Sequence, residues 1–160
     1  MGIAMLACAF FVPRAAEARW PVGYIPKERT WFAYGVRYTH PQKAAASLTI
    51  MRAMETDTPM VTGWFVQAEP GLGGGKLSAG FGGLSPSDHA WVPPIFGAGV
   101  KASLMRTWGS PHGVSPGRTL LGPELDFTLF YAKLSAGYFW RVDSSTGPRG
   151  YFTWGVGVGF

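Results

Sequence analysis

The last ten residues of the chain, YFTWGVGVGF, alternate strictly between bulky apolar and small side chains. Successive side chains of a β-strand point to opposite faces, so a period of two predicts a strand with two unlike faces. One face of this strand is large and apolar, and the other is mostly glycine. Any fold that contains the strand must provide a different environment for each face. The apolar residues are Phe152, Trp154, Val156, Val158 and Phe160.

The same alternation recurs in six further segments, separated by stretches rich in glycine and proline. Each segment sets large apolar residues against glycine, alanine, serine, threonine or a charge. An eighth segment, Ala46 to Glu55, alternates less cleanly because Arg52 falls on its apolar face. Its residues also favour helix. We predict a strand there, with a helix as the alternative. The six clear segments lie at 32–39, 64–69, 76–82, 99–104, 121–130 and 133–142.

The composition supports an all-β chain. Glycine accounts for 23 of the 160 residues and proline for 13, and both interrupt helices. Aromatic residues make up 15% of the chain and charged residues only 14%, which excludes the composition of a disordered protein. The mean hydropathy of +0.09 excludes a protein built from several transmembrane helices.

The N-terminus has the layout of a secretory signal. An apolar run over residues 3–12 precedes Ala16-Glu17-Ala18, which matches a small-x-small cleavage site. We predict a signal peptide at 1–18, an N-terminal extension at 19–30 and a β-domain at 31–160. The alternative is a buried N-terminal segment. Cys8 is the one cysteine of the chain and would leave with the signal, so the mature chain would form no disulfide.

The two faces of the strands indicate which side points outward. The less apolar face is mainly glycine, serine, alanine and threonine, and such small side chains fit the interior of an eight-stranded barrel. The apolar face would then meet lipid. Because open sheet edges cannot exist in hydrocarbon, the sheet must close into a barrel. We predict an all-β fold, a closed antiparallel up-and-down transmembrane β-barrel of eight strands. Aromatic residues at the strand ends fit a lipid–water interface: Trp31, Trp64, Trp108, Tyr131, Trp140 and Tyr151.

The final strand resembles the C-terminal targeting strand of bacterial outer-membrane barrels. Such strands end in phenylalanine, with apolar residues at alternating positions before it, as Phe152, Trp154, Val156, Val158 and Phe160 stand here. Together with the signal and the strand pattern, this ending is similar to the small OmpA/OmpX-like barrels of Gram-negative bacteria. The resemblance implies an outer-membrane location and contact with outer-membrane lipid. It also implies that the barrel-assembly machinery recognises the last strand.

Charges of both signs lie on the less apolar face, which the barrel would turn into its lumen. We expect a salt-bridge network that closes the lumen; a narrow polar path or a small-ligand site is the alternative. If Tyr131 and Ala132 form a two-residue turn, Glu124 lies opposite Phe139 and diagonal to Arg141. The residues of the predicted network are Arg37, Glu69, Lys76, Lys101, Glu124, Asp126, Lys133 and Arg141.

No motif in the sequence predicts catalysis, a cofactor or a metal site. Ser87, Asp88 and His89 have the residue types of a catalytic triad, but triads are assembled from positions far apart in sequence. Residues 71–76, GLGGGK, lack the spacing of a phosphate-binding loop and predict a hairpin turn. The histidines at 40, 89 and 112 fall in connections without metal-ligand spacing.

We therefore expect a monomer with a structural or interaction role at the bacterial envelope. The cations are scattered singly along the sequence, so we expect no nucleic-acid partner. One alternative is an outer-membrane lipid-modifying enzyme similar to lipid A deacylase, a family that places a histidine and a serine on one strand. Another is a soluble periplasmic β-barrel that binds a small ligand. The predicted topology puts the C-terminus in the periplasm and residues 109–118 and 143–150 outside.

Overall fold

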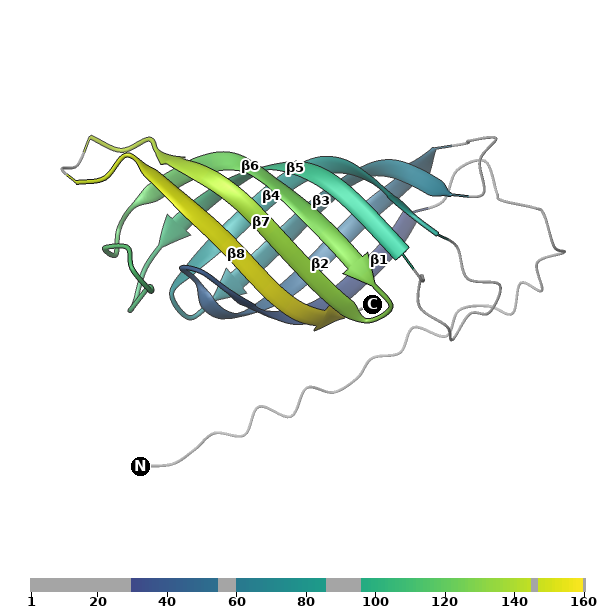
Figure 1. Ribbon diagram of the computed structural model, residues 1–160, viewed down its shortest axis with the longest axis horizontal. Coiled ribbons are helices and arrows are strands. Elements are labelled where there is room, and N and C mark those ends of the chain that lie inside the picture. Colours follow the sequence, from purple (N-terminus) through teal and green to yellow (C-terminus); the bar gives the residue numbers. More distant parts are fainter. Residues whose placement is uncertain (1–29, 55–59, 86–95, 145–146, 160) are drawn as a thin grey trace, which may run out of the picture.

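The computed structural model describes residues 30–54, 60–85, 96–144 and 147–159. Figure 1 shows their strands lying side by side in one sheet that curls around a long axis. Within these ranges, no helix is long and apolar enough to cross a membrane. The strands are β1 (Thr30–Thr39), β2 (Lys43–Met54), β3 (Val61–Gly71), β4 (Gly74–Leu84), β5 (Phe96–Thr107), β6 (Thr119–Leu129), β7 (Ala132–Arg141) and β8 (Gly150–Gly159).

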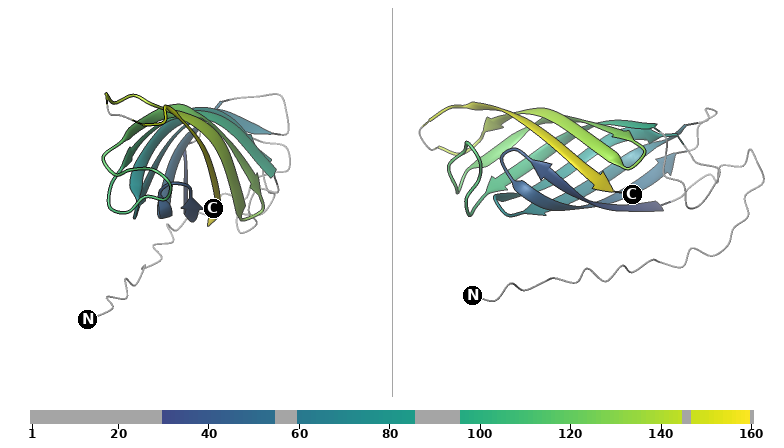
Figure 2. Two further views of the ribbon diagram at one scale, coloured as in Figure 1. Left: turned by 60° about the vertical axis from the view of Figure 1, so that its left-hand side comes forward. Right: turned by 60° about the horizontal axis from the view of Figure 1, so that its bottom comes forward.

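The sheet closes on itself. Each strand is antiparallel to its neighbour in sequence, and β8 pairs with β1, so the order around the barrel is the order along the chain. The closing pairing joins Gly35–Thr39 of β1 to Gly155–Gly159 of β8. Figure 2 shows the closed wall from two further sides. The prediction of an eight-stranded antiparallel up-and-down barrel is confirmed.

The segment with mixed sequence signals is a strand. β2 spans Lys43–Met54 and pairs with β1 on one side and β3 on the other. Arg52 does not break its alternation, because the residue is exposed on the outer face with Leu48 and Ile50. Hydrogen-bonded neighbours on both sides outweigh the helix propensity of the isolated segment.

Exposed and buried residues alternate along the strands. In β5, Val100 and Leu104 on the outside are 52% and 47% exposed, whereas Lys101 and Ser103 on the inside are 2% and 0% exposed. Large apolar side chains cover the outer wall, and polar or small ones fill the inside. This arrangement reverses the usual soluble pattern, in which the apolar face of a sheet is buried.

Two short hairpins lie at one end of the barrel. His40–Gln42 joins β1 to β2, and Leu72–Gly73 joins β3 to β4, so the glycine-rich stretch 71–76 forms a hairpin turn as predicted. The longer connections 108–118 and 142–149 lie at the same end because antiparallel strands alternate in direction. We call this the loop end. We call the opposite end, where β1 begins and β8 ends, the terminal end.

The β6–β7 hairpin at the terminal end differs from its prediction. Its turn is Phe130–Tyr131, one residue earlier than expected, and Phe130 adopts a φ of 52°. The pairing therefore shifts by two positions, and Glu124 lies opposite Gly137. The predicted pairing of Glu124 with Phe139 is wrong. A left-handed phenylalanine is uncommon, and no sequence rule for turns would place one there.

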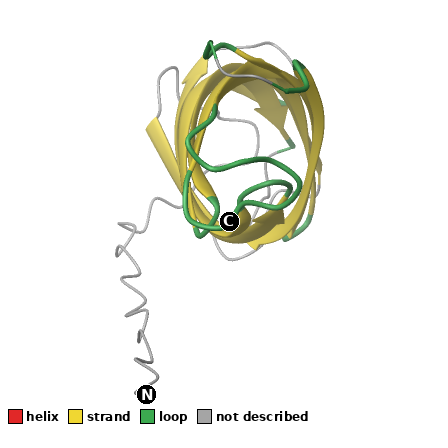
Figure 3. Cartoon of the chain, turned by 90° about the vertical axis from the view of Figure 1, so that its left-hand side faces the viewer, coloured by secondary structure: helices red, strands yellow, loops and turns green. Residues whose placement is uncertain are grey.

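The connection 108–118 folds back over the loop end. The amide of Trp108 donates to the carbonyl of Gly73, and the amide of His112 donates to the carbonyl of Pro41 at 3.0 Å. These bonds tie the connection to both short hairpins. Figure 3 looks onto this end and shows loop segments crossing the mouth of the barrel.

Candidate functional site

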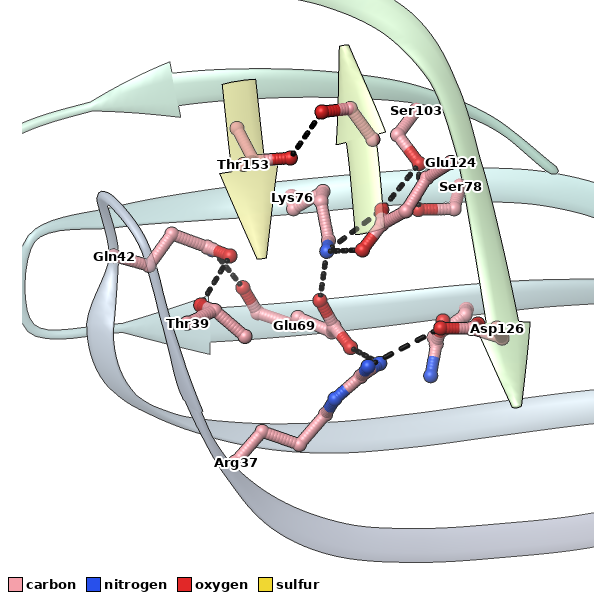
Figure 4. Close-up of polar contacts among 12 residues, drawn as sticks. Arg37, Thr39, Gln42, Glu69, Lys76, Ser78, Ser103, Glu124, Asp126 and Thr153 are labelled. Carbon is pink, nitrogen blue, oxygen red and sulfur yellow. Dashed lines mark hydrogen bonds and ion pairs between the residues drawn. The ribbon is translucent and has the colours of Figure 1, made fainter. Parts of the chain in front are cut away.

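Charged side chains from β1, β3, β4, β5 and β6 meet inside the barrel. Strand alternation turns each of them inward, and barrel curvature brings their tips together (Figure 4). They are 0–4% exposed, except for Asp126, whose side chain is 21% exposed. We call this set the lumen network: Arg37, Glu69, Lys76, Lys101, Glu124 and Asp126.

Glu69 lies at the centre of the lumen network. Its Oε1 accepts a hydrogen bond from Arg37 Nη1 at 2.5 Å, and its Oε2 lies 2.6 Å from Lys76 Nζ. Lys76 also donates to Glu124 Oε1 at 2.8 Å. Arg37 Nη2 donates to Asp126 Oδ1 at 3.1 Å. A continuous chain of charge-assisted contacts therefore joins β1, β3, β4 and β6 across the lumen.

Lys101 adds β5 to the lumen network. Its Nζ donates to Asp126 Oδ2, and it donates to Gln67 Oε1 at 2.6 Å. It also lies 3.6 Å from Glu124 Oε2. Ser103, on the same strand, donates to that oxygen at 3.1 Å. Lys76 thus engages both oxygens of Glu124, and groups on β5 add contacts to Oε2.

The lumen network is electrically balanced, because three cations face three carboxylates. Charges are tolerated in a protein interior when they are paired and hydrogen-bonded. Each contact joins different strands, so the network cross-links the wall from within. Its described contacts pair carboxylates with cations, and the hydroxyl of Ser103 adds a hydrogen bond to Glu124. The geometry is that of a structural cross-link.

Of the two remaining residues of the predicted network, Arg141 lies apart from it. Arg141 is at the loop end, where its Nε lies 3.7 Å from Asp143 Oδ1. The shifted β6–β7 register explains this position, because it sets Arg141 opposite Leu120. Lys133 faces inward nearer the terminal end, in register with Gly157 of β8, and it interacts electrostatically with Asp126 and Arg37 of the lumen network.

Two buried glutamines belong to the site and were not predicted. Gln67 contacts Lys101, and alternation along β3 was a sufficient signal to place it inward. Gln42 is 0% exposed and donates its Nε2 to the carbonyl of Glu69 at 3.0 Å. Thr39 Oγ1 donates to Gln42 Oε1 at 3.1 Å. Gln42 lies in a turn, where no period-two pattern could have indicated its direction.

The lumen is filled differently on the two sides of the network. Toward the loop end, Met105, Val114, Leu120 and Phe139 form an apolar cluster, and each is at most 7% exposed. Val114 comes from the connection 108–118, so that connection supplies part of the filling. Toward the terminal end, several inward positions are partly exposed glycines, among them Gly80, Gly82, Gly99 and Gly157. The barrel is therefore closed at the loop end.

His40 and His112 meet at the loop end. Their ring centroids lie 5.6 Å apart in an edge-to-face contact. Burial lowers the pKa of His40, and the nearby His112 lowers it further, because two protonated rings would repel each other. Within the described ranges, no group of three or more histidine, cysteine, aspartate or glutamate side chains could hold a metal ion.

The residues of the predicted targeting strand lie on the outer wall. Phe152, Trp154, Val156 and Val158 are 62%, 44%, 44% and 54% exposed. Phe160 and the stretch Ser87-Asp88-His89 lie outside the described residues, as does the predicted signal at 1–18. Comparisons with protein-family models, curated proteins and solved structures found no match.

Proposed function

We propose that the chain is an outer-membrane β-barrel protein with a structural or interaction role at the bacterial envelope. The observation that carries the proposal is the polarity of the barrel. A balanced ion network lies inside, and large apolar side chains such as Phe32, Leu125 and Phe152 are 62–68% exposed outside. Lipid hydrocarbon would cover this surface, and a closed sheet leaves few backbone groups unpaired in it.

Aromatic pairs on the outer wall support this proposal. Trp64 and Phe81 pack edge to face near the terminal end, with centroids 5.3 Å apart. Tyr138 and Trp140 form a similar pair near the loop end, also at 5.3 Å. Aromatic girdles at both interfaces are typical of transmembrane barrels. The distance between these two zones would correspond to the hydrocarbon thickness.

The proposed route to the membrane uses both ends of the sequence. Residues 1–18 would direct export, and β8 would be the strand that the barrel-assembly machinery recognises. The outward row Phe152, Trp154 and Val156 on β8 supports this role, because it forms a continuous apolar row on the outer face of the strand. After assembly, the protein would be a monomer surrounded by outer-membrane lipid.

The lumen network and the apolar cluster behind it support a structural role rather than transport. No specific observation favours either alternative, the soluble ligand-binding barrel or the lipid-modifying enzyme. A soluble ligand-binding barrel would need a covered outer wall, whereas this one is apolar and exposed. For a deacylase-like enzyme, the described histidines His40 and His112 lie in a turn and a connection and not on a strand.

Membrane fractionation combined with heat-modifiable migration on a denaturing gel tests the proposal. We expect the chain in the outer-membrane fraction, with the unheated folded form migrating differently from the boiled form. We also expect folding to require detergent or lipid. A monodisperse folded species in detergent-free buffer would contradict the membrane proposal and favour the soluble barrel.

A further inference from the structure

Charge is distributed unequally between the two ends of the barrel. The up-and-down topology gathers cations that are scattered in sequence, so the loop end carries five cations against one carboxylate, Asp143. Among the described residues, the cations toward the terminal end are only Arg52 and Lys133. We call the loop-end cations the cationic rim: Lys43, Arg106, Arg118, Arg141 and Arg149.

The cationic rim carries more positive charge than its carboxylate can neutralise. Asp143 is shared, because Arg118 Nη1 lies 3.5 Å and Arg141 Nε 3.7 Å from its Oδ1. Arg106 donates to a neutral partner, the hydroxyl of Thr119, at 2.5 Å. Arg106 and Arg149 are both exposed. The rim therefore presents an excess of positive charge to its surroundings and attracts anions.

Amphipathic aromatic residues lie on the outer wall next to the cationic rim. The indole N–H of Trp108 donates to the carbonyl of Gly71 at 3.2 Å, which holds the ring at the loop end. Trp140 precedes Arg141 of the rim directly. Tryptophan and tyrosine prefer the headgroup level of a bilayer, and basic side chains are attracted to its anionic lipids. Aromatic rings beside exposed cations, at one end of a barrel whose outer wall is apolar, fit the headgroup level of a lipid surface.

We propose that the cationic rim binds the phosphate monoester groups of membrane lipids in the leaflet at the loop end. The inference rests on the proposed membrane function and adds the class of lipid and the end of the barrel that binds it. Guanidinium groups suit this ligand because their planar donors match phosphate oxygens in pairs. Arg106 and Arg149 contribute most, because both are exposed.

The test uses the full chain folded in zwitterionic detergent micelles, with folding checked by heat-modifiable migration. Short-chain phosphatidic acid is titrated while the amide NMR signals of residues 106–118 and 142–149 are followed. We expect saturable shifts confined to the loop end. The double variant Arg106→Gln/Arg149→Gln should bind about 10-fold more weakly, since each basic group near a surface contributes measurably to anionic-lipid affinity. Arg52→Gln removes an exposed arginine outside the rim and should leave the affinity unchanged.

Short-chain phosphatidylcholine and inorganic phosphate serve as comparison probes. Equal affinity for phosphatidylcholine, equal affinity for inorganic phosphate, or unchanged affinity in the double variant would overturn the inference. Tighter binding of a single-stranded oligonucleotide would also overturn it and assign the rim to nucleic acid. Failure of the membrane proposal can be told apart from failure of this inference. The short-chain lipids are water-soluble, so the same titration can be run on the chain if it folds without detergent.

Discussion

Lys76 on β4 and Glu124 on β6 are joined across the intervening strand β5. Both carboxylate oxygens of Glu124 lie within 2.9 Å of the ammonium nitrogen of Lys76. In a flat sheet, side chains two strands apart start about 10 Å from each other. The curvature of a narrow barrel converges them, so this ion pair depends on closure of the sheet and in turn stabilises it.

Replacing Lys76 by methionine should destabilise the fold by about 3 kcal/mol, because Glu69 and Glu124 stay buried after losing a cation. Urea unfolding in detergent micelles measures the change. Lys43→Met is the matched control: Lys43 makes an exposed contact with Ser110 at 3.4 Å, and its loss should cost less than about 0.5 kcal/mol. Equal effects of the two substitutions would contradict a stabilising role for the lumen network.

Gly157 should not accept a side chain, although the alternation alone suggests that a small residue fits there. A Cβ atom at Gly157 would lie 2.6 Å from the carbonyl oxygen of Val36 and 2.6 Å from Arg37 Cγ. We expect Gly157→Ala to cost about 1–3 kcal/mol through overpacking. At Gly99, also inward, a Cβ would lie 3.2 Å from the ring of Phe65 and 3.3 Å from the carbonyl oxygen of Phe81, which is less crowded than at Gly157, so Gly99→Ala should cost less. The same unfolding measurement ranks the two variants, and the reverse order would count against this packing.

Strand pattern and barrel closure could be predicted from the sequence because period-two alternation is a local signal that survives in each strand. It also placed Glu69, Lys76 and Glu124 on the inner face. The pairing register of the strands was harder to predict. The left-handed Phe130 places the β6–β7 turn one residue earlier than the pattern indicates, and this separates Arg141 from Glu124. The gathering of cations at the loop end follows from topology, so single positions in the sequence did not reveal it.

Acidification should loosen the connection 108–118. The pKa of His40 lies below its ordinary value of 6.5, so as pH falls below 6.5 the unfolded chain takes up a proton that the folded chain resists. Stability is therefore lost as pH falls through the interval below 6.5. Hydrogen exchange of the His112 amide, which is bonded to Pro41, reports the loosening.

The interaction between His40 and His112 can be tested by His112→Gln. This substitution removes the charge next to His40 and should raise the pKa of His40 toward its ordinary value. NMR titration of the His40 ring in both proteins gives the comparison. An unchanged titration in the variant would show that burial alone sets the pKa of His40.

The orientation proposed for the barrel predicts that the loop end faces the outside of the cell. An epitope tag inserted after Gly117 should project from the loop end, because this glycine is exposed and has no atom within 4 Å of its Cβ position. Antibody should label intact cells that carry this tag. Labelling that appears only after lysis would place the loop end in the periplasm instead.

An arginine on the outer wall should be costly at mid-strand and tolerated at the loop end. Leu125 is 63% exposed and pairs with Val100 and Ala136, which lie near the middle of β5 and β7. Val142 is 55% exposed but lies just beyond β7 at the loop end. In a membrane, Leu125→Arg should cost about 2–4 kcal/mol and Val142→Arg about 0–1 kcal/mol, since the penalty for a charge falls toward the interface.

The similar exposure of these two residues gives the comparison its discriminating power. In water, both substitutions would act on exposed side chains, and both should stay within about 0.5 kcal/mol of the unmodified chain. Unfolding free energies measured in lipid vesicles therefore separate the membrane barrel from a soluble one. A small and equal effect at Leu125 and Val142 would rule out hydrocarbon around the middle of the barrel.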